Sequence, residues 1–140
     1  MILLDTNVVS EVMRPSPDAR VLEWLDAQPA GEVWITAVTV GEIQLGVALL
    51  PQGGRKQRLA EAFAAMVMTD FADACLPYDA LAAAEYAEIV AARTRMGRPI
   101  SVEDAQIAAI ARSAGMKLAT RNVSDFKGID RLSIINPWTV

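Results

Sequence analysis

Short apolar segments alternate along the chain with longer ones in which apolar residues recur every three or four positions. The continuously apolar segments at residues 2–4 and 33–35 predict strands buried on both faces of a parallel sheet. Further strands are expected at residues 117–120 and, more weakly, at 74–76 and 132–135. The helical spacing predicts a short helix that ends before Arg14, helices at residues 16–26, 36–50, 55–68, 79–96 and 101–115, and a short turn or helix at 122–126.

Residues that favour helix ends stand at the boundaries of these segments. Pro17 follows Ser16 at a first helical position, and Gly115 occupies the expected position after a helix C-terminus. N-caps are expected at Thr6 or Asn7, Ser16, Asp79 and Ser101. The alternation of strands and helices predicts one α/β domain over residues 1–140. Its mainly parallel sheet of four or five strands would be flanked by helices and joined by right-handed crossovers.

Composition narrows the class of protein. A hydrophobic content of 53% fits a packed globular domain, and no segment reaches the 18 or more uncharged apolar residues of a membrane span. The first residues lack the basic segment of a secretory signal, and Cys75, the only cysteine, has no partner for an internal disulfide. We therefore expect a cytoplasmic protein without a membrane-bound part.

The absence of histidine restricts the chemistry further. With no histidine among 140 residues, Ser-His-Asp sites, Cys-His sites and histidine-ligated metals are excluded, so carboxylates and a hard cation become the expected tools of an enzyme. The net charge of −4 divides unevenly: residues 1–90 carry 5 basic and 13 acidic side chains, and residues 91–140 carry 8 basic and 4 acidic ones. A basic, phosphate-facing surface in the second part is compatible with this division, although solvated faces often carry such an excess.

Two carboxylates in the first half of the chain lack an obvious solvent-facing role. Asp5 ends the first strand and is the only charge among the first ten residues, where a helix cap is the competing interpretation. Glu42 is the only ionisable residue from Val33 through Gly54, and helical spacing aligns it with the apolar residues 38, 45 and 49. An ionised carboxylate on such a face requires a partner, either a metal or an arginine from elsewhere in the chain.

Two further aspartates have structural explanations that compete with a functional one. Asp104 follows Ser101 by three residues and can complete a capping box, whereas Asp125 is compatible with an ordinary loop aspartate. All four acids nevertheless follow strands or begin helices, and these positions meet at the carboxyl edge of a parallel sheet. Carboxylates converging there would repel one another unless a divalent cation held them, and such cations support in-line phosphoryl displacement.

The order of these motifs resembles that of PIN-domain ribonucleases, in particular the VapC-type toxins and their FitB-like branch. The resemblance spans nearly the whole chain and is carried by Leu4–Asp5–Thr6–Asn7, by residues 36–42 with Gly46, by residues 104–109, and by residues 119–122 with Asp125 and Phe126. It implies a PIN-like fold and a Mg²⁺- or Mn²⁺-dependent endoribonuclease.

The resemblance also implies roles for individual residues. Asp5, Glu42 and Asp104 match metal-binding acidic positions, and we take Asp125 as the fourth, with Asn122 as a neutral ligand or water-positioning group. Thr6 and Thr120 are expected to hydrogen-bond the carboxylates, and Asn7 to orient Asp5 or cap the helix. RNA phosphates are expected to contact Arg93, Arg95, Arg98 and Arg121.

The implied partners are an RNA substrate, a VapB-like antitoxin that covers the site, and a second copy of the chain. DNA would be bound only through the antitoxin. Our hypothesis is a type II toxin that hydrolyses RNA phosphodiester bonds. One rival is a haloacid-dehalogenase-like phosphatase with Asp5 as nucleophile, although that family has an aspartate where this chain has Asn7. The other is a non-catalytic PIN-fold module that acts in complex with a DNA-binding partner.

Overall fold

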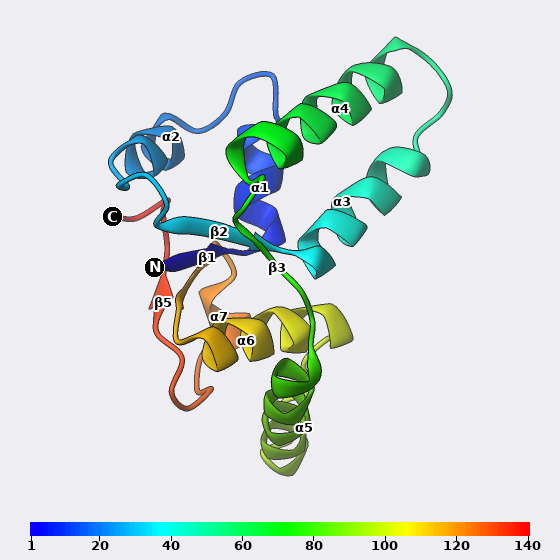
Figure 1. Ribbon diagram of the computed structural model, residues 1–140. Coiled ribbons are helices and arrows are strands. Elements are labelled where there is room, and N and C mark those ends of the chain that lie inside the picture. Colours follow the sequence, from blue (N-terminus) through cyan, green and yellow to red (C-terminus); the bar gives the residue numbers. More distant parts are fainter.

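The computed structural model describes all 140 residues and contains a five-stranded parallel sheet (Figure 1). The strands are β1 (Ile2–Leu4), β2 (Val33–Thr36), β3 (Cys75–Leu76), β4 (Lys117–Ala119) and β5 (Ile134–Ile135), in the order β3-β2-β1-β4-β5. The predicted α/β class and parallel sheet are confirmed. Because β1 lies at the centre, the residue that follows it reaches the middle of the carboxyl edge.

Seven α-helices surround this sheet. They are α1 (Thr6–Val12), α2 (Ala19–Asp26), α3 (Ala37–Ala48), α4 (Gly54–Ala65), α5 (Ala80–Arg95), α6 (Val102–Ala114) and α7 (Val123–Phe126). Helix α4 is shorter than the predicted 55–68 segment, because a π-helical turn, Met66–Asp70, follows it directly. In Figure 1, α3 and α4 form a helical pair on one side of the sheet, and α5 and α6 lie on the other.

Alternating side chains of β1 divide the interior into two apolar clusters. Ile2 and Leu4 pack with residues of α1 to α4, whereas Leu3 packs with residues of α5, α6 and α7. Both faces of the sheet are therefore covered, as the short apolar strands predict. No helix is long and apolar enough to cross a membrane.

The predicted caps of α5 and α6 are confirmed, as is the interpretation of Asp5 as a helix cap. The caps predicted at Thr6 or Asn7 for α1 and at Ser16 for α2 are wrong. Asp79 and Ser101 accept from backbone N–H groups of their helices, and Gly115 has the left-handed φ of 67°. Helix α1 is instead capped by Asp5, which accepts from the N–H of Thr6. Helix α2 is capped by Asp18 rather than Ser16, and begins two residues after Pro17. An aspartate two positions further on therefore supplies the acceptor that we assigned to the serine.

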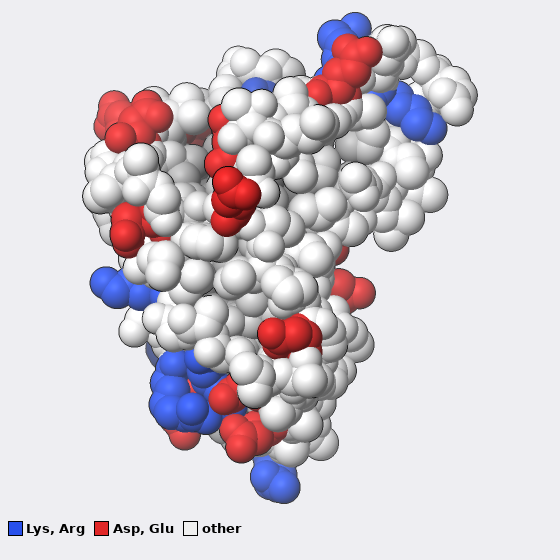
Figure 2. Space-filling model, viewed as in Figure 1, with Lys and Arg blue, Asp and Glu red and all other residues white.

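Two of the eight basic residues after position 90 form ion pairs with acidic side chains. Arg112, whose side chain is only 6% exposed, bonds Glu85 and Glu88 across the α5–α6 contact, and Arg131 reaches the same two glutamates. On the face drawn in Figure 2, basic groups lie beside acidic ones and do not form one continuous basic surface. The excess of basic residues after position 90 therefore contributes to helix packing as well as to surface charge.

Candidate active site

A polar pocket of about 430 Å³ lies at the carboxyl edge of the sheet, where β1 meets α1. No hydrophobic residue lines it, although the sheet and helices beneath it are apolar. Its walls come from α1, α3, α6 and the segment after β4, which are far apart in the sequence. The lining residues are Asp5, Thr6, Asn7, Ser10, Glu11, Arg14, Glu42, Asp104 and Asn122.

Asp5 is the most enclosed carboxylate of the pocket, with 4% of its surface exposed. Its Oδ1 accepts from the Thr6 N–H at 2.8 Å, and its Oδ2 accepts from the Thr120 hydroxyl at 2.7 Å and the Asn7 amide at 3.2 Å. Burial raises the pKa of Asp5 to about 6, and the charges of Asp104 and Glu42 add to the rise. The hydrogen bonds from Thr120 and Thr6 lower the pKa but do not offset the effect of burial. Asp5 is thus both the helix cap and a desolvated carboxylate near two others.

Glu42 is half-buried on α3 and faces Thr6, which donates its hydroxyl to Oε1 at 2.7 Å. The Thr6 hydroxyl also lies 2.9 Å from that of Thr39, which accepts from Thr36 at 3.4 Å. A row of three threonine hydroxyls therefore leads from the end of β2 to the carboxylate. Glu42 forms no ion pair, so the alternative of an arginine partner is excluded.

The face of α3 around Glu42 differs from the one we expected. Leu45 and Leu49, which share its helical alignment, are 60% and 76% exposed, so this alignment does not lie in the core. Glu42 reaches the pocket because α3 begins directly after β2 and its first turns stand over the sheet edge.

Asp104 lies in the first turn of α6, where its N–H donates to the Ser101 hydroxyl at 3.1 Å. The serine cap is therefore confirmed, but the return bond of a capping box, from the Ser101 N–H to the Asp104 carboxylate, is not formed. The half-buried carboxylate lines the pocket instead. Burial raises the pKa of Asp104, and the nearby charges of Asp125 and Glu103 raise it further. Asp104 thus lies in the first turn of α6 and also contributes negative charge to the site.

The segment after β4 brings Asn122 rather than Asp125 to the pocket wall. The Asn122 N–H donates to the Thr120 hydroxyl at 3.0 Å, which fixes this residue beside Asp5. Asp125 is exposed and does not line the pocket, although its charge acts on Asp104. The geometry therefore favours Asn122 over our choice, Asp125, for direct contact with a group bound between the carboxylates.

The four arginines expected to contact RNA phosphate have different surroundings. Arg93 is only 4% exposed, and its guanidinium donates to the carbonyl oxygens of Arg98 and Asp125, both at 2.8 Å. Arg93 therefore lacks the exposure that a phosphate contact requires, and it ties the end of α5 to α7 instead.

The other three arginines are not buried in this way. Arg121 stands 5.2 Å from the centroid of the Trp138 ring. Arg95 and Arg98 are exposed, and Arg98 also donates to the Ser124 carbonyl at 3.4 Å.

Several residues of the site were not anticipated from the sequence: Ser10, Glu11, Arg14, Thr36 and Thr39. Ser10 follows Thr6 by four residues on the same face of α1, a spacing that was available as a signal, whereas Arg14 lies beyond the end of that helix. Thr36 ends β2 and caps α3 by accepting from the N–H of Thr39, much as Asp5 follows β1 and caps α1.

The donor set of the pocket suits a hard divalent cation, because carboxylate, amide and hydroxyl oxygens are the ligands such ions prefer. As they stand, no three acidic side chains are grouped closely enough to hold a metal ion. Asp5 is fixed by three donors, but Glu42 and Asp104 are only half-buried, so their side chains have room to approach a bound ion.

Comparisons with known proteins agree with this geometry. Residues 2–132 match the PIN-domain family. The chain is 42% identical over 138 residues to Toxin FitB of Neisseria gonorrhoeae, with 99% of each chain covered, and 39% identical to VapC ribonuclease Y4jK of Sinorhizobium fredii, with 99% and 98% covered. A structure of FitAB bound to an IR36 DNA fragment superposes with a TM-score of 0.92 at 42% identity, covering 100% of this chain and 97% of that one. The chain therefore belongs to the PIN-domain family, in the branch that contains FitB and the VapC ribonucleases.

Proposed function

We propose that this protein is the toxin of a type II toxin–antitoxin pair and acts as a divalent-metal-dependent endoribonuclease. The observation that carries the proposal is the convergence of Asp5, Glu42 and Asp104 on one polar pocket in a chain without histidine. The likeness to proteins named Toxin FitB and VapC ribonuclease supports the same class of activity. Mg²⁺ is the proposed ion, with Mn²⁺ as a substitute.

Some pocket residues would bind the metal ion, and others hold those ligands in place. Asp5, Glu42 and Asp104 would ligate the metal, while the hydroxyls of Thr120 and Thr6 hold Asp5 and Glu42 in place at 2.7 Å. The Asn7 amide also donates to the Thr120 hydroxyl at 3.2 Å and so fixes the donor of Asp5. A bound divalent cation lowers the pKa of a water molecule and stabilises negative charge on phosphate oxygens. Because carboxylates are in excess in this pocket, they repel an RNA phosphate until a cation is bound.

The proposed partners follow from the relatives and from the exposed apolar residues. The FitAB structure contains DNA, so we propose a VapB-like antitoxin that covers the site and binds DNA, with no direct DNA contact by this chain. Leu45, Leu49 and Leu81 expose 60%, 76% and 72% of their surfaces, more than a packed monomer requires. These residues offer contact area to the antitoxin or to a second copy of the chain.

Purified protein is expected to cleave RNA in Mg²⁺ or Mn²⁺ and to stop when EDTA exceeds the metal. The reason is that the carboxylates of the pocket repel the substrate phosphate unless a cation is bound between them. RNA fragments should be resolved by gel and their ends mapped. Equal cleavage in excess EDTA would contradict the mechanism, and absence of cleavage in either metal would favour a binding module without turnover.

Replacing Asn122 and Asp125 separately is expected to show which of them serves the metal site. Because Asn122 lines the pocket and Asp125 does not, Asn122→Ala should weaken Mn²⁺ binding by roughly tenfold, equivalent to about 1.4 kcal/mol. Asp125→Asn should weaken it less, since that carboxylate acts through its charge on Asp104. Mn²⁺ titration by calorimetry measures both, and the reverse order would restore Asp125 as the fourth ligand.

A further inference from the structure

Arg14 is the only basic residue among the nine that line the carboxylate pocket. The pocket also contains Asp5, Glu11, Glu42 and Asp104, so its own charge is strongly negative. One divalent cation would not neutralise four carboxylates. A phosphodiester that enters the pocket therefore needs a second source of positive charge, and Arg14 is the one that the pocket supplies.

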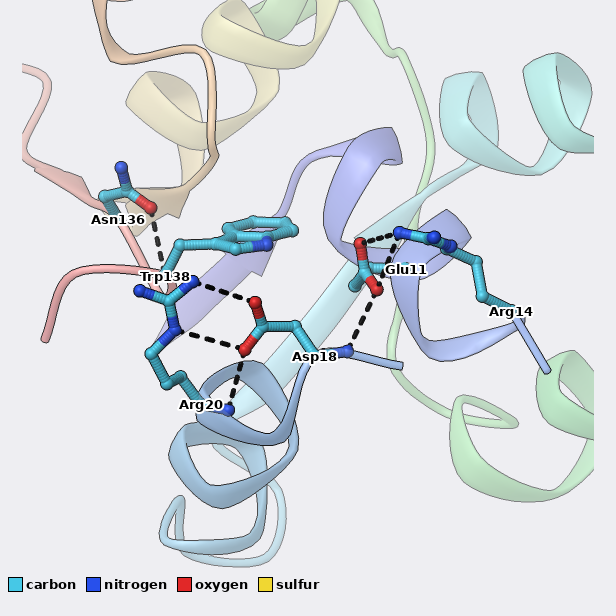
Figure 3. A network of polar contacts seen from close by, with 6 residues as sticks. All are labelled: Glu11, Arg14, Asp18, Arg20, Asn136 and Trp138. Atoms are coloured by element: carbon cyan, nitrogen blue, oxygen red, sulfur yellow. Dashed lines mark hydrogen bonds and ion pairs between the residues drawn. The ribbon is translucent and has the colours of Figure 1, made fainter. Parts of the chain in front are cut away.

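The guanidinium of Arg14 is held in place by a buried carboxylate. Glu11 is only 5% exposed, and its Oε1 and Oε2 lie 3.2 and 3.3 Å from Nη1 of Arg14. Oε2 also accepts from the N–H of Asp18 at 3.0 Å, so the glutamate is anchored to the start of α2 (Figure 3). Arg14 itself is 64% exposed, and its Nε and Nη2 atoms form no hydrogen bond within the protein. The N–H groups of Nε and Nη2 are thus free to donate to a group outside the chain.

Open space lies on both sides of this side chain. A second cavity of about 880 Å³ runs between α3 and α4 and shares Thr6, Ser10, Arg14 and Glu42 with the carboxylate pocket. Arg14 therefore stands where the two cavities join. A polymer that reaches the carboxylates through the larger cavity would pass this guanidinium.

We propose that Arg14 binds a backbone phosphate of the RNA beside the bond that is cleaved, with Glu11 as the residue that positions it. This assignment rests on the proposed ribonuclease function. Guanidinium groups suit phosphate because they donate two parallel N–H bonds in a fixed plane. The arginine lies among the carboxylates that would hold the metal, whereas Arg121 stands over Trp138 and Arg93 is buried.

Arg20 provides a matched control for Arg14. It is also exposed and also pairs with an acid of the same polar network, since its Nη2 lies 2.9 Å from Oδ2 of Asp18 (Figure 3). Arg20 lines neither cavity. Substitution at the two positions therefore removes the same charge from the protein, once inside the proposed site and once outside it.

The test compares wild type, Arg14→Ala, Arg14→Lys and Arg20→Ala in two assays, and thermal unfolding measures the stability of each protein. Binding of a short fluorescent single-stranded RNA is measured in Ca²⁺, and cleavage of RNA in Mg²⁺. We expect Arg14→Ala to raise Kd and KM roughly tenfold and to change kcat less than about threefold. The slope of log Kd against log salt should fall by about 0.7, because that is the value for one phosphate contact on a single strand. Arg14→Lys should recover part of the affinity, and Arg20→Ala should behave as wild type.

Each other result overturns a distinct claim. If wild type cleaves RNA while Arg14→Ala keeps its Kd, KM and salt slope, the assignment of Arg14 is wrong and the proposed function stands. If wild type neither binds nor cleaves RNA, the proposed function fails together with the assignment. An equal loss of thermal stability and affinity in Arg14→Ala would make its role structural.

Discussion

Asp5→Asn and Asp104→Asn are each expected to lower RNA cleavage by roughly 10³-fold or more, which corresponds to about 4 kcal/mol of lost transition-state stabilisation. Asparagine keeps the size of the side chain but removes one of the negative charges that would hold the metal. At limiting Mg²⁺, part of the loss should be recovered by raising the metal concentration if binding of the ion is the defect. A loss in kcat that persists at saturating Mg²⁺ reports on the chemical step itself.

Asp73→Asn is a suitable control for these variants, because Asp73 is an exposed aspartate outside the pocket. Its cleavage rate should equal that of wild type. In cells, induced wild type should arrest growth, and Asp5→Asn should not. Arrest by both proteins would separate toxicity from catalysis, and full activity of either pocket variant would remove that carboxylate from the metal site.

The sheet and the main carboxylates could be predicted because both depend on short-range patterns. A strand of three apolar residues fixes where the chain leaves the sheet, and Asp5 follows it directly. Asp104 lies in the first turn of a helix with a serine cap, which limits its position to the end of that helix. Parallel topology then brings such positions to one edge, and no knowledge of side-chain contacts is needed.

The errors arose where a contact between distant segments decides the outcome. Arg93 resembles its neighbours Arg95 and Arg98 in sequence, but its acceptors are two backbone carbonyls that only the folded loops bring to it. The choice between Asn122 and Asp125 likewise depends on the Thr120 hydroxyl, which holds Asn122 at the pocket, whereas Asp125 is not among the lining residues although both are exposed. A carboxylate is the more familiar metal ligand, and residue type alone therefore favoured Asp125, which remains a prediction that the two substitutions test.

Glu42 lies in the pocket as predicted, but one premise of that prediction is wrong. Its alignment with Leu45 and Leu49 suggested a buried carboxylate, yet both leucines are exposed. The side chain still meets the other carboxylates, because Thr6 donates to it from the helix that Asp5 begins. The adjacent residues Asp5 and Thr6 thus link the carboxylates of β1 and α3, a connection that spans 36 positions and is invisible in local periodicity.

Without metal, Asp5 is expected to make the folded protein less stable as the pH rises from about 4 to about 6. Its pKa is about 6 in the folded protein and 3.8 in its ordinary state. In this interval the unfolded chain loses the proton while the folded chain keeps it, so the free energy of unfolding falls. The total decrease is about 3 kcal/mol, from roughly 1.4 kcal/mol per pKa unit. The stabilising contribution is fully present below pH 4 and is lost above pH 6.

Thermal unfolding of wild type and Asp5→Asn in EDTA tests this linkage. Because asparagine does not titrate, Tm of the variant minus Tm of wild type should increase between pH 4 and pH 7, by on the order of 5–10 °C. Comparing the two proteins across pH removes the constant effect of the changed hydrogen bonds to Thr6 and Thr120. Mg²⁺ at pH 7 should then raise Tm of wild type more than that of the variant, because a cation stabilises the ionised carboxylate. A difference in Tm that stays constant from pH 4 to pH 7 would show that the Asp5 carboxyl ionises in the folded protein as readily as in the unfolded chain.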